Sequence, residues 1–195
     1  MQRLAFWGAS FQFMCGILAC INFLYFAVKH NRKMDALGNN GRCVAKDGIN
    51  HPIHVTGDTD LNYVTDVGDQ FYRVFVAGLL INTLLTVMAI MVCFAPRTKL
   101  NAVYKGTMFA KTLDVIFVFA VSYIRWSHAG RVCSGDYIYK PITLESHNEG
   151  RLVLEAQFID VFLIVQYIQL FILMVVSAVL TIFFDEVNED KERDL

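Results

Sequence analysis

Charged residues and prolines are scarce in this 195-residue sequence. Only 18% of the residues are charged and only three are proline, whereas soluble domains carry about 25% charged residues. The formal net charge is −1, so the chain lacks the strong positive field that nucleic acid binding needs. With so few prolines and no Ser- or Gln-rich tract, a long disordered linker is not expected. We expect one domain and no nucleic-acid partner.

Other absences narrow the function. The sequence shows no phosphate-binding loop and no pattern typical of a Ser/His/Asp triad or a Cys/His dyad. All five histidines lie outside the long apolar runs, so no facing pair is available for a b-type haem. There is also no Asn-x-Ser/Thr site for N-glycosylation. We therefore expect neither enzymatic activity nor a cofactor.

Four long apolar runs dominate the chain. The run 161–184 has 24 residues without a charge, and a helix needs about 20 apolar residues to cross a bilayer. The predicted spans are about 4–28, 74–95, 107–126 and 158–184. The first has 25 uncharged residues, more than the roughly 7–15 of a signal-peptide core, so we expect it to stay as a helix. The pattern predicts an all-α membrane protein, a four-transmembrane-helix bundle in a lipid bilayer.

The connections between the spans suggest an orientation. The short connection 96–106 has three basic residues and no acidic one, which is typical of a cytoplasmic loop. Both termini, including the acidic tail 185–195, would then be cytoplasmic, and the loops 29–73 and 127–157 would lie outside. The expected location is the plasma membrane or an endomembrane, as a multi-pass protein.

The two outer loops carry strand and turn signals. Lys46-Asp47-Gly48 separates two strand-like runs, 42–45 and 49–51, and Asp-Gly in that setting favours a hairpin turn. Loop 127–157 contains Tyr137–Leu144, whose alternation is typical of a strand. The two loops therefore predict a small extracellular or lumenal cap that contains β structure.

The cysteines divide by location. Cys15, Cys20 and Cys93 lie in predicted spans, whereas Cys43 and Cys133 lie one in each outer loop. An oxidising compartment permits a disulfide between the last two. The sequence therefore predicts a Cys43–Cys133 bond that ties the two outer loops together.

A run of acidic residues in the first outer loop imitates part of a calcium-binding loop. Its members are Asp58, Asp60, Asn62, Asp66 and Asp69. The position that needs a glycine is Tyr63, and the last position carries an aspartate instead of the bidentate glutamate. A solvated, Asp-rich turn is the better supported interpretation, and no metal is predicted.

Three charged residues fall within the third predicted span, and Arg125, beside Trp126 at its outer end, is interpreted as an interface anchor. Lys111 and Asp114 are three residues apart, so they lie on one face of a helix. An internal salt bridge is the favoured interpretation, with Lys111 reaching toward the interface. A proton or ion path, or a bond to the polar residues Gln12 and Asn22 of span one, is the alternative.

Small residues in span one are spaced four apart, in the pairs Ala5/Ala9 and Gly16/Cys20. This spacing lets helix backbones approach closely. Ordinary packing within the chain is the favoured interpretation, and a face for a neighbouring subunit is the alternative.

Four spans, a longer first outer loop and a cysteine pair across the loops resemble the tetraspan superfamilies. The MARVEL/Casparian-strip-like and claudin-like groups are the most similar in architecture. Asp114 is similar to the acidic residue that Casparian-type proteins carry in span three. The arginine that these proteins carry in span one has no good match, because Arg3 lies at the extreme edge of that span. The Gly-Leu-Trp signature of claudins is absent from loop one. The resemblance implies a membrane-organising protein that assembles laterally.

The sequence therefore favours a non-enzymatic structural tetraspan protein that self-associates, or packs beside other membrane proteins, to organise or shape a membrane. One alternative is a channel or transporter subunit that uses the intramembrane polar residues. Another is an accessory subunit of a larger membrane complex.

Overall fold

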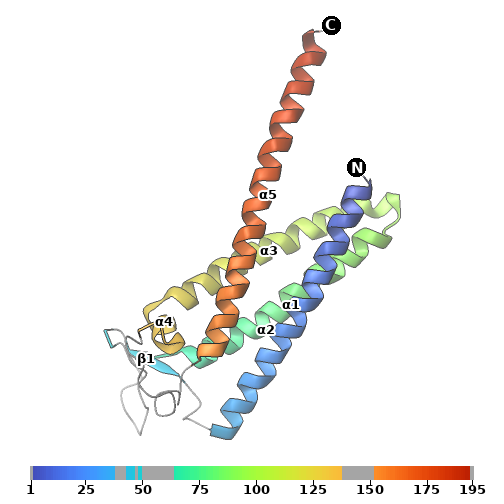
Figure 1. The fold of residues 1–195 in the computed structure, drawn as a ribbon. Helices are drawn as coiled ribbons and strands as arrows, with labels where there is room; N and C mark the ends of the chain where they lie inside the picture. Colours follow the sequence, from blue (N-terminus) through green and yellow to red (C-terminus); the bar gives the residue numbers. More distant parts are fainter. Residues whose placement is uncertain (1, 38–42, 47, 50–63, 138–151, 194–195) are drawn as a thin grey trace. The chain divides into compact units, whose positions relative to one another are not determined.

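The computed structural model describes residues 2–37, 43–46, 48–49, 64–137 and 152–193. It is mostly helical and has two compact units, Met1–Gln157 and Phe158–Leu195. The elements of the first unit are α1 (Gln2–Leu37), β1 (Val44–Lys46), β2 (Val64–Asp66), α2 (Val67–Phe94), the 3-10 turn η3 (Arg97–Lys99), α3 (Leu100–Trp126) and α4 (His128–Ser134) (Figure 1). Helix α5 (Val153–Arg193) begins in the first unit, and its remainder forms the second.

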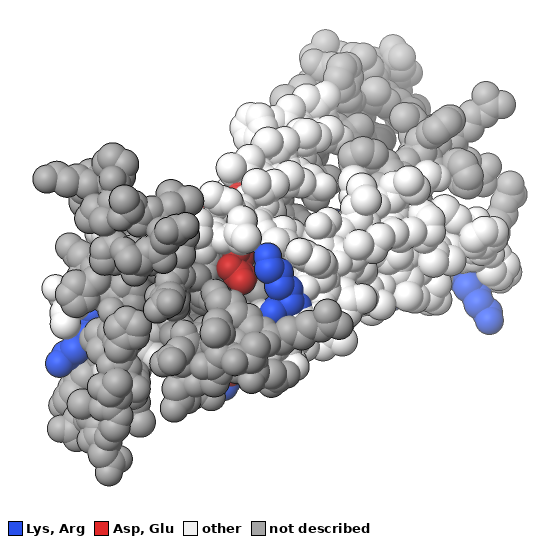
Figure 2. All heavy atoms as spheres, turned by 60° about the horizontal axis from the view of Figure 1, so that its bottom comes forward, with Lys and Arg blue, Asp and Glu red and all other residues white. Residues whose placement is uncertain are grey.

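Four helices in the described part of the chain are long and apolar enough to cross a membrane. The qualifying segments are Gln12–Asn31, Val67–Phe94, Asn101–Trp126 and Val153–Val176. Each overlaps one predicted span, and together they fit a multi-pass membrane protein. On the face shown in Figure 2, the described helical surface is largely free of charged side chains. Such a surface is suited to contact with the hydrocarbon of a lipid bilayer.

The helices are longer than the predicted spans. Helix α2 starts at Val67, seven residues before the expected start, because Asp66 caps it and accepts a hydrogen bond from the Asp69 amide at 3.1 Å. Helix α1 continues through the basic stretch to Leu37, and α5 continues through most of the acidic tail to Arg193. The connection between α2 and α3 is correspondingly short, because α3 starts at Leu100.

Helices α1 and α2 pack antiparallel along their lengths, and α3 returns beside α2. Close approach between α1 and α2 rests on small residues. A Cβ on Gly78 of α2 would collide with the Phe23 ring of α1, so the glycine makes room for that ring. Phe23 also meets Phe117 of α3 edge-on, with ring centroids 6.2 Å apart. One aromatic side chain thus joins three helices.

The sheet has two strands, and its pairing differs from the predicted hairpin. Strand β1 pairs antiparallel with β2, with Ala45 opposite Thr65. The predicted turn forms, because Gly48 has φ 83° and the Ile49 amide donates to the Lys46 carbonyl at 3.2 Å. Ile49 itself is not in a strand, so the run 49–51 is not the partner found for β1, and residues 50–51 lie outside the described part. The segment that enters α2 takes that place.

The second outer loop begins with a helix that was not predicted from the sequence. Helix α4 is capped by Ser127, whose hydroxyl accepts from the Gly130 amide at 3.1 Å. It ends at Gly135, which adopts the left-handed conformation with φ 83°. A serine at the start and a glycine at the end are standard signals of helix termini. Of that strand only Tyr137 is described, and the rest lies outside the described residues.

Candidate functional site

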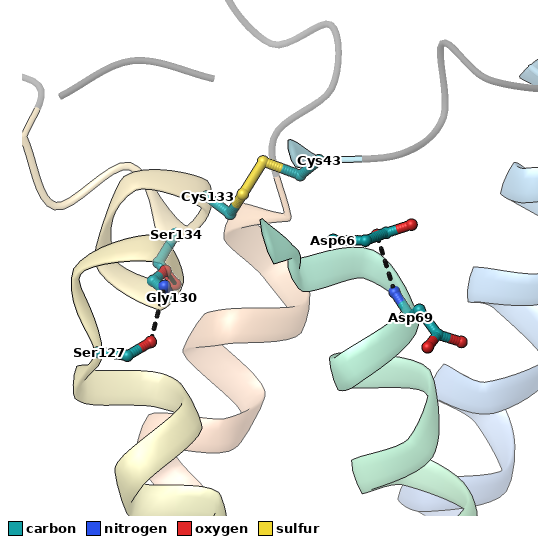
Figure 3. The surroundings of a disulfide bond; sticks show 7 residues. All are labelled: Cys43, Asp66, Asp69, Ser127, Gly130, Cys133 and Ser134. Atoms are coloured by element: carbon teal, nitrogen blue, oxygen red, sulfur yellow. Dashed lines mark hydrogen bonds between the residues drawn. A yellow bond between two sulfur atoms is a disulfide. The ribbon is translucent and has the colours of Figure 1, made fainter. Parts of the chain in front are cut away.

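The disulfide between Cys43 and Cys133 links the two outer loops, as the sequence predicts, and joins the residue before β1 to α4 (Figure 3). The two Cα atoms are 5.8 Å apart, and both residues are fully buried. The Cys43 carbonyl accepts from the Val67 amide, where α2 begins, and the Cys133 carbonyl accepts from the Leu152 amide, just before α5, both at 2.9 Å. The bond therefore anchors the starts of two membrane-length helices to one covalent link.

The corner between α3 and α4 depends on Ser127 and Gly130. Besides capping α4, the Ser127 hydroxyl donates to the Ile124 carbonyl at 2.8 Å. A Cβ on Gly130 would collide with the Ile124 carbonyl and lie 2.8 Å from the Arg125 carbonyl oxygen. Only a glycine lets the backbone of α4 fold against the last turn of α3 in this way.

A buried ion pair closes the same corner. The Arg125 guanidinium donates to both carboxylate oxygens of Asp136, at 2.8 and 3.1 Å. The Arg125 side chain is only 5% exposed, and its guanidinium stacks over the Trp126 ring with 5.1 Å to the centroid. Arg131 adds a longer contact to Asp136 at 3.8 Å. The sequence predicts only an interface anchor at Arg125, and the ion pair was not predicted because Asp136 follows an unpredicted helix.

His128 connects the two outer loops through polar contacts. Its Nε2 lies 3.2 Å from the Ile49 carbonyl, and its Nδ1 lies 3.4 Å from the Tyr137 hydroxyl. A carbonyl oxygen only accepts, so Nε2 carries the proton and, in the neutral ring, Nδ1 accepts from Tyr137. The Arg131 guanidinium stacks over the Tyr137 ring at 4.8 Å. With the disulfide, these contacts make the described part of the cap a connected structure.

His30 is a buried residue of α1, although it falls in the predicted outer loop 29–73. It is 1% exposed in α1, and its ring stacks on Tyr72 with centroids 6.2 Å apart and meets Phe75 at 6.3 Å. A Cβ on Gly68 would lie 3.7 Å from both His30 Nε2 and the Cys43 amide nitrogen, so the first turn of α2 lies close to both residues. The buried residues Phe23, Ala27 and His30 are spaced four and three apart. This helical spacing is the sequence signal that could have placed His30 on the buried face of the first helix.

The predicted packing pair Gly16/Cys20 faces α2. A Cβ on Gly16 would collide with the Thr86 hydroxyl, and Cys20 Sγ lies 3.6 Å from Thr83 Oγ1. These two residues serve packing within the chain, which was the favoured interpretation. Ala5 and Ala9 lie in α1, but their side chains are outside the described set.

The polar residues of the spans have separate environments. Asn22 is exposed and donates from Nδ2 to the Leu18 carbonyl at 2.8 Å, and Gln12 is half-buried. Lys111 Nζ lies 3.8 Å from Asp114 Oδ2, which is the internal pair expected from their spacing. Asp114 is buried, and its Oδ1 has no hydrogen-bond partner in the described structure. No hydrogen bond in the described residues links Asn22 to Asp114.

Two acidic residues of the candidate calcium loop, Asp66 and Asp69, are described, and both make contacts within α2. Asp66 caps α2, and Asp69 pairs with Arg73 one turn later at 2.7 Å. Asp58, Asp60 and Asn62 lie outside the described residues. Among the described residues, no group of three or more His, Cys, Asp or Glu side chains is placed to hold a metal ion.

Comparisons with family models, with characterised proteins and with solved structures find no match for this chain. The cap and the helices are therefore the features from which a function is inferred.

Proposed function

We propose that this chain is a non-enzymatic, multi-pass membrane protein that packs laterally, with copies of itself or with other membrane proteins, to organise or shape a membrane. The observation that carries the proposal is that the helices expose apolar side chains, whereas their polar side chains bond to their own backbone. Large apolar side chains are exposed along α1, α2 and α3. Seven polar side chains in these helices bond to the backbone carbonyl four residues earlier: Asn22, Asn82, Thr83, Thr86, Thr107, Thr112 and Ser122.

This arrangement supports packing over conduction. A hydroxyl that donates to its own helix is satisfied locally, so it adds little to a continuous polar path. Exposed apolar faces on membrane-length helices, by contrast, are surfaces for lipid or for other helices. The small residues described at the α1–α2 contact are already used within the chain, so lateral contacts would involve the outer helix faces.

The cap supports a role in contacts outside the bilayer. The disulfide, the Arg125–Asp136 pair and the His128 contacts hold its described residues together. A disulfide persists in an oxidising compartment, so we place the cap on the extracellular or lumenal side and both termini in the cytoplasm. Attaching a protease-cleavable tag to either terminus of the protein in sealed vesicles tests this. Protection of the tags in outside-out vesicles supports the orientation, and cleavage refutes it.

The experiment that tests lateral assembly is a native mass measurement in mild detergent and in nanodiscs, with and without crosslinking in the original membrane. A homogeneous mass of two or more copies, or a defined complex with other membrane proteins, is the expected result. A monomer under every condition, including crosslinking before extraction, refutes the proposal.

A second candidate, a channel or transporter subunit, is favoured by one observation only. Asp114 is buried within α3, and one of its oxygens lacks a hydrogen-bond partner in the described structure. Intramembrane carboxylates often belong to ion or proton pathways. Flux into liposomes that Asp114→Asn abolishes, and that Asp69→Asn at the outer end of α2 leaves intact, would establish this function in place of the first. The absence of flux removes it.

A further inference from the structure

Asn22 is a polar side chain in an apolar setting. It lies near the middle of the membrane-length segment Gln12–Asn31, and it is exposed. One of its N–H groups donates to the Leu18 carbonyl at 2.8 Å. A side-chain amide has two N–H donors and an oxygen with two lone pairs. Within the described residues, the second N–H and the oxygen therefore still require hydrogen-bond partners.

The position of Asn22 on α1 is set by the residues that contact α2. Gly16, Cys20 and Phe23 face α2. Two residues along an α-helix correspond to about 200° of rotation, so Asn22 lies on the side of α1 opposite Cys20. Packing within the α1–α2 pair therefore does not cover the amide.

The neighbours of Asn22 on this outer face form a stripe. Leu18 is four residues before it and Tyr25 three after it, and they are 59% and 56% exposed. Spacings of four and three residues are those of a coiled-coil seam, in which a central asparagine fixes register and the number of helices. Left-handed crossings of this type are also common in membrane bundles.

The bilayer restricts which partner fits the stripe. An amide left without partners in hydrocarbon costs free energy, because no water is available to replace the missing bonds. A second copy inserted with the same orientation presents its own α1 in parallel, so its Asn22 lies at the same depth. An amide is both donor and acceptor, and two amides related by a two-fold axis can each donate to the other.

We propose that two copies of this chain pair through the outer face of α1, along Leu18, Asn22 and Tyr25, with the two Asn22 amides hydrogen-bonded to each other near the middle of the membrane. The inference rests on the proposed lateral assembly and identifies its contact. Hydrogen bonds of this kind between membrane helices are worth about 1–2 kcal/mol in model peptides. Replacing Asn22 should therefore weaken dimerisation about fivefold to thirtyfold.

The first test measures energy transfer between labelled copies in liposomes at decreasing protein-to-lipid ratio. Asn22→Leu, which keeps the size but removes the hydrogen bonds, should reduce the association constant about tenfold. Thr112→Val is the matched control, because Thr112 is an exposed polar residue of α3 bonded to its own helix at Met108. It should leave the association constant unchanged. Equal association of Asn22→Leu and wild type would overturn the proposal.

The second test locates the contact by disulfide crosslinking. In a chain with Cys15, Cys20 and Cys93 replaced by serine and the Cys43–Cys133 bond kept, Asn22→Cys should give a covalent dimer on mild oxidation. Phe119→Cys, on the exposed face of α3, should not. A crosslink from position 22 to another protein or within the same chain refutes pairing between copies.

The outcomes separate this inference from the proposed function. Wild-type protein that assembles, with neither an effect of Asn22→Leu nor a crosslink at position 22, refutes the α1 contact and leaves lateral assembly standing. Wild-type protein that associates neither with itself nor, on crosslinking in the original membrane, with other membrane proteins refutes both.

Discussion

Arg125 and Asp136 are joined by two hydrogen bonds, of 2.8 and 3.1 Å, across the whole of α4. The arginine ends one membrane-length helix, and the aspartate follows the short helix that carries Cys133. The pair therefore fixes the direction in which the chain leaves α3, and with it the position from which the disulfide reaches β1.

Removing the carboxylate from this pair should destabilise the protein. Asp136→Asn removes the Asp136 charge from the buried Arg125 guanidinium, and breaking a buried pair costs about 3–5 kcal/mol. Because Asp136 is 24% exposed, we expect a smaller loss, of about 2–3 kcal/mol. Thermal unfolding in mild detergent measures the loss as a lower midpoint.

Asp69→Asn is the matched control for Asp136→Asn. It breaks the Asp69–Arg73 pair, whose side chains are 48% and 77% exposed, and exposed pairs contribute about 0–1 kcal/mol. Equal shifts of the unfolding midpoint in the two variants would show that the Arg125–Asp136 pair contributes no more to stability than an exposed pair does.

Gly130→Ala should distort the α3–α4 corner. The new methyl group would meet the carbonyls of Ile124 and Arg125, and backbone atoms cannot move aside as a flexible side chain does. Overpacking of this kind costs about 1–3 kcal/mol or more. We expect a lower unfolding midpoint and slower formation of the Cys43–Cys133 bond during refolding, followed by gel mobility without reductant.

Gly106→Ala is the control for the corner glycine. Its methyl group would lie 2.6 Å from the end of the Met88 side chain, which can rotate away, and alanine also favours the helix by about 1 kcal/mol. The variant should be close to wild type. If Gly130→Ala were equally harmless, the close approach at the corner would not be a constraint on the fold.

The sequence predicted the four membrane-length helices and the cysteine pairing because both depend on simple, local signals. Length and apolar composition identify a span, and the two loop cysteines had only each other outside the spans. Helix ends were predicted less well, because a charged residue interrupts an apolar run without interrupting a helix. Asp69 and Arg73 illustrate this, since they form an ion pair within the first turns of α2.

The details of the cap could not be predicted from local patterns. Strand β1 pairs with a segment about twenty residues away along the chain, and no short-range signal distinguishes that partner from the run after Gly48. Arg125, His128 and Asp136 were likewise recognisable only once α4 was in place. Of the polar residues in the spans, Lys111 and Asp114 were paired by helical spacing alone. The exposure of Asn22 required knowledge of the face that α2 occupies.

Loss of the disulfide should weaken the fold substantially. The bond closes a loop of 90 residues, and restriction of the unfolded chain by such a loop contributes about 4–5 kcal/mol in the chain-entropy description. Cys43→Ser should therefore lower the unfolding midpoint and abolish the mobility difference between reduced and oxidised samples. Cys93→Ser, in α2, should retain that difference. An unchanged difference in Cys43→Ser would mean that another pair of cysteines is bonded.

Truncation of Phe23 should separate α1 from its neighbours. Its ring is 1% exposed, fills the space above Gly78 and meets Phe117. Phe→Ala at such a site leaves a cavity and costs about 3–5 kcal/mol, whereas Phe119→Ala, at a ring that is 65% exposed, should cost less than about 1 kcal/mol. Unfolding midpoints of the two variants in the same detergent give the comparison. Similar losses at both positions would mean that the α1–α2 contact contributes no more than an outer helix face does.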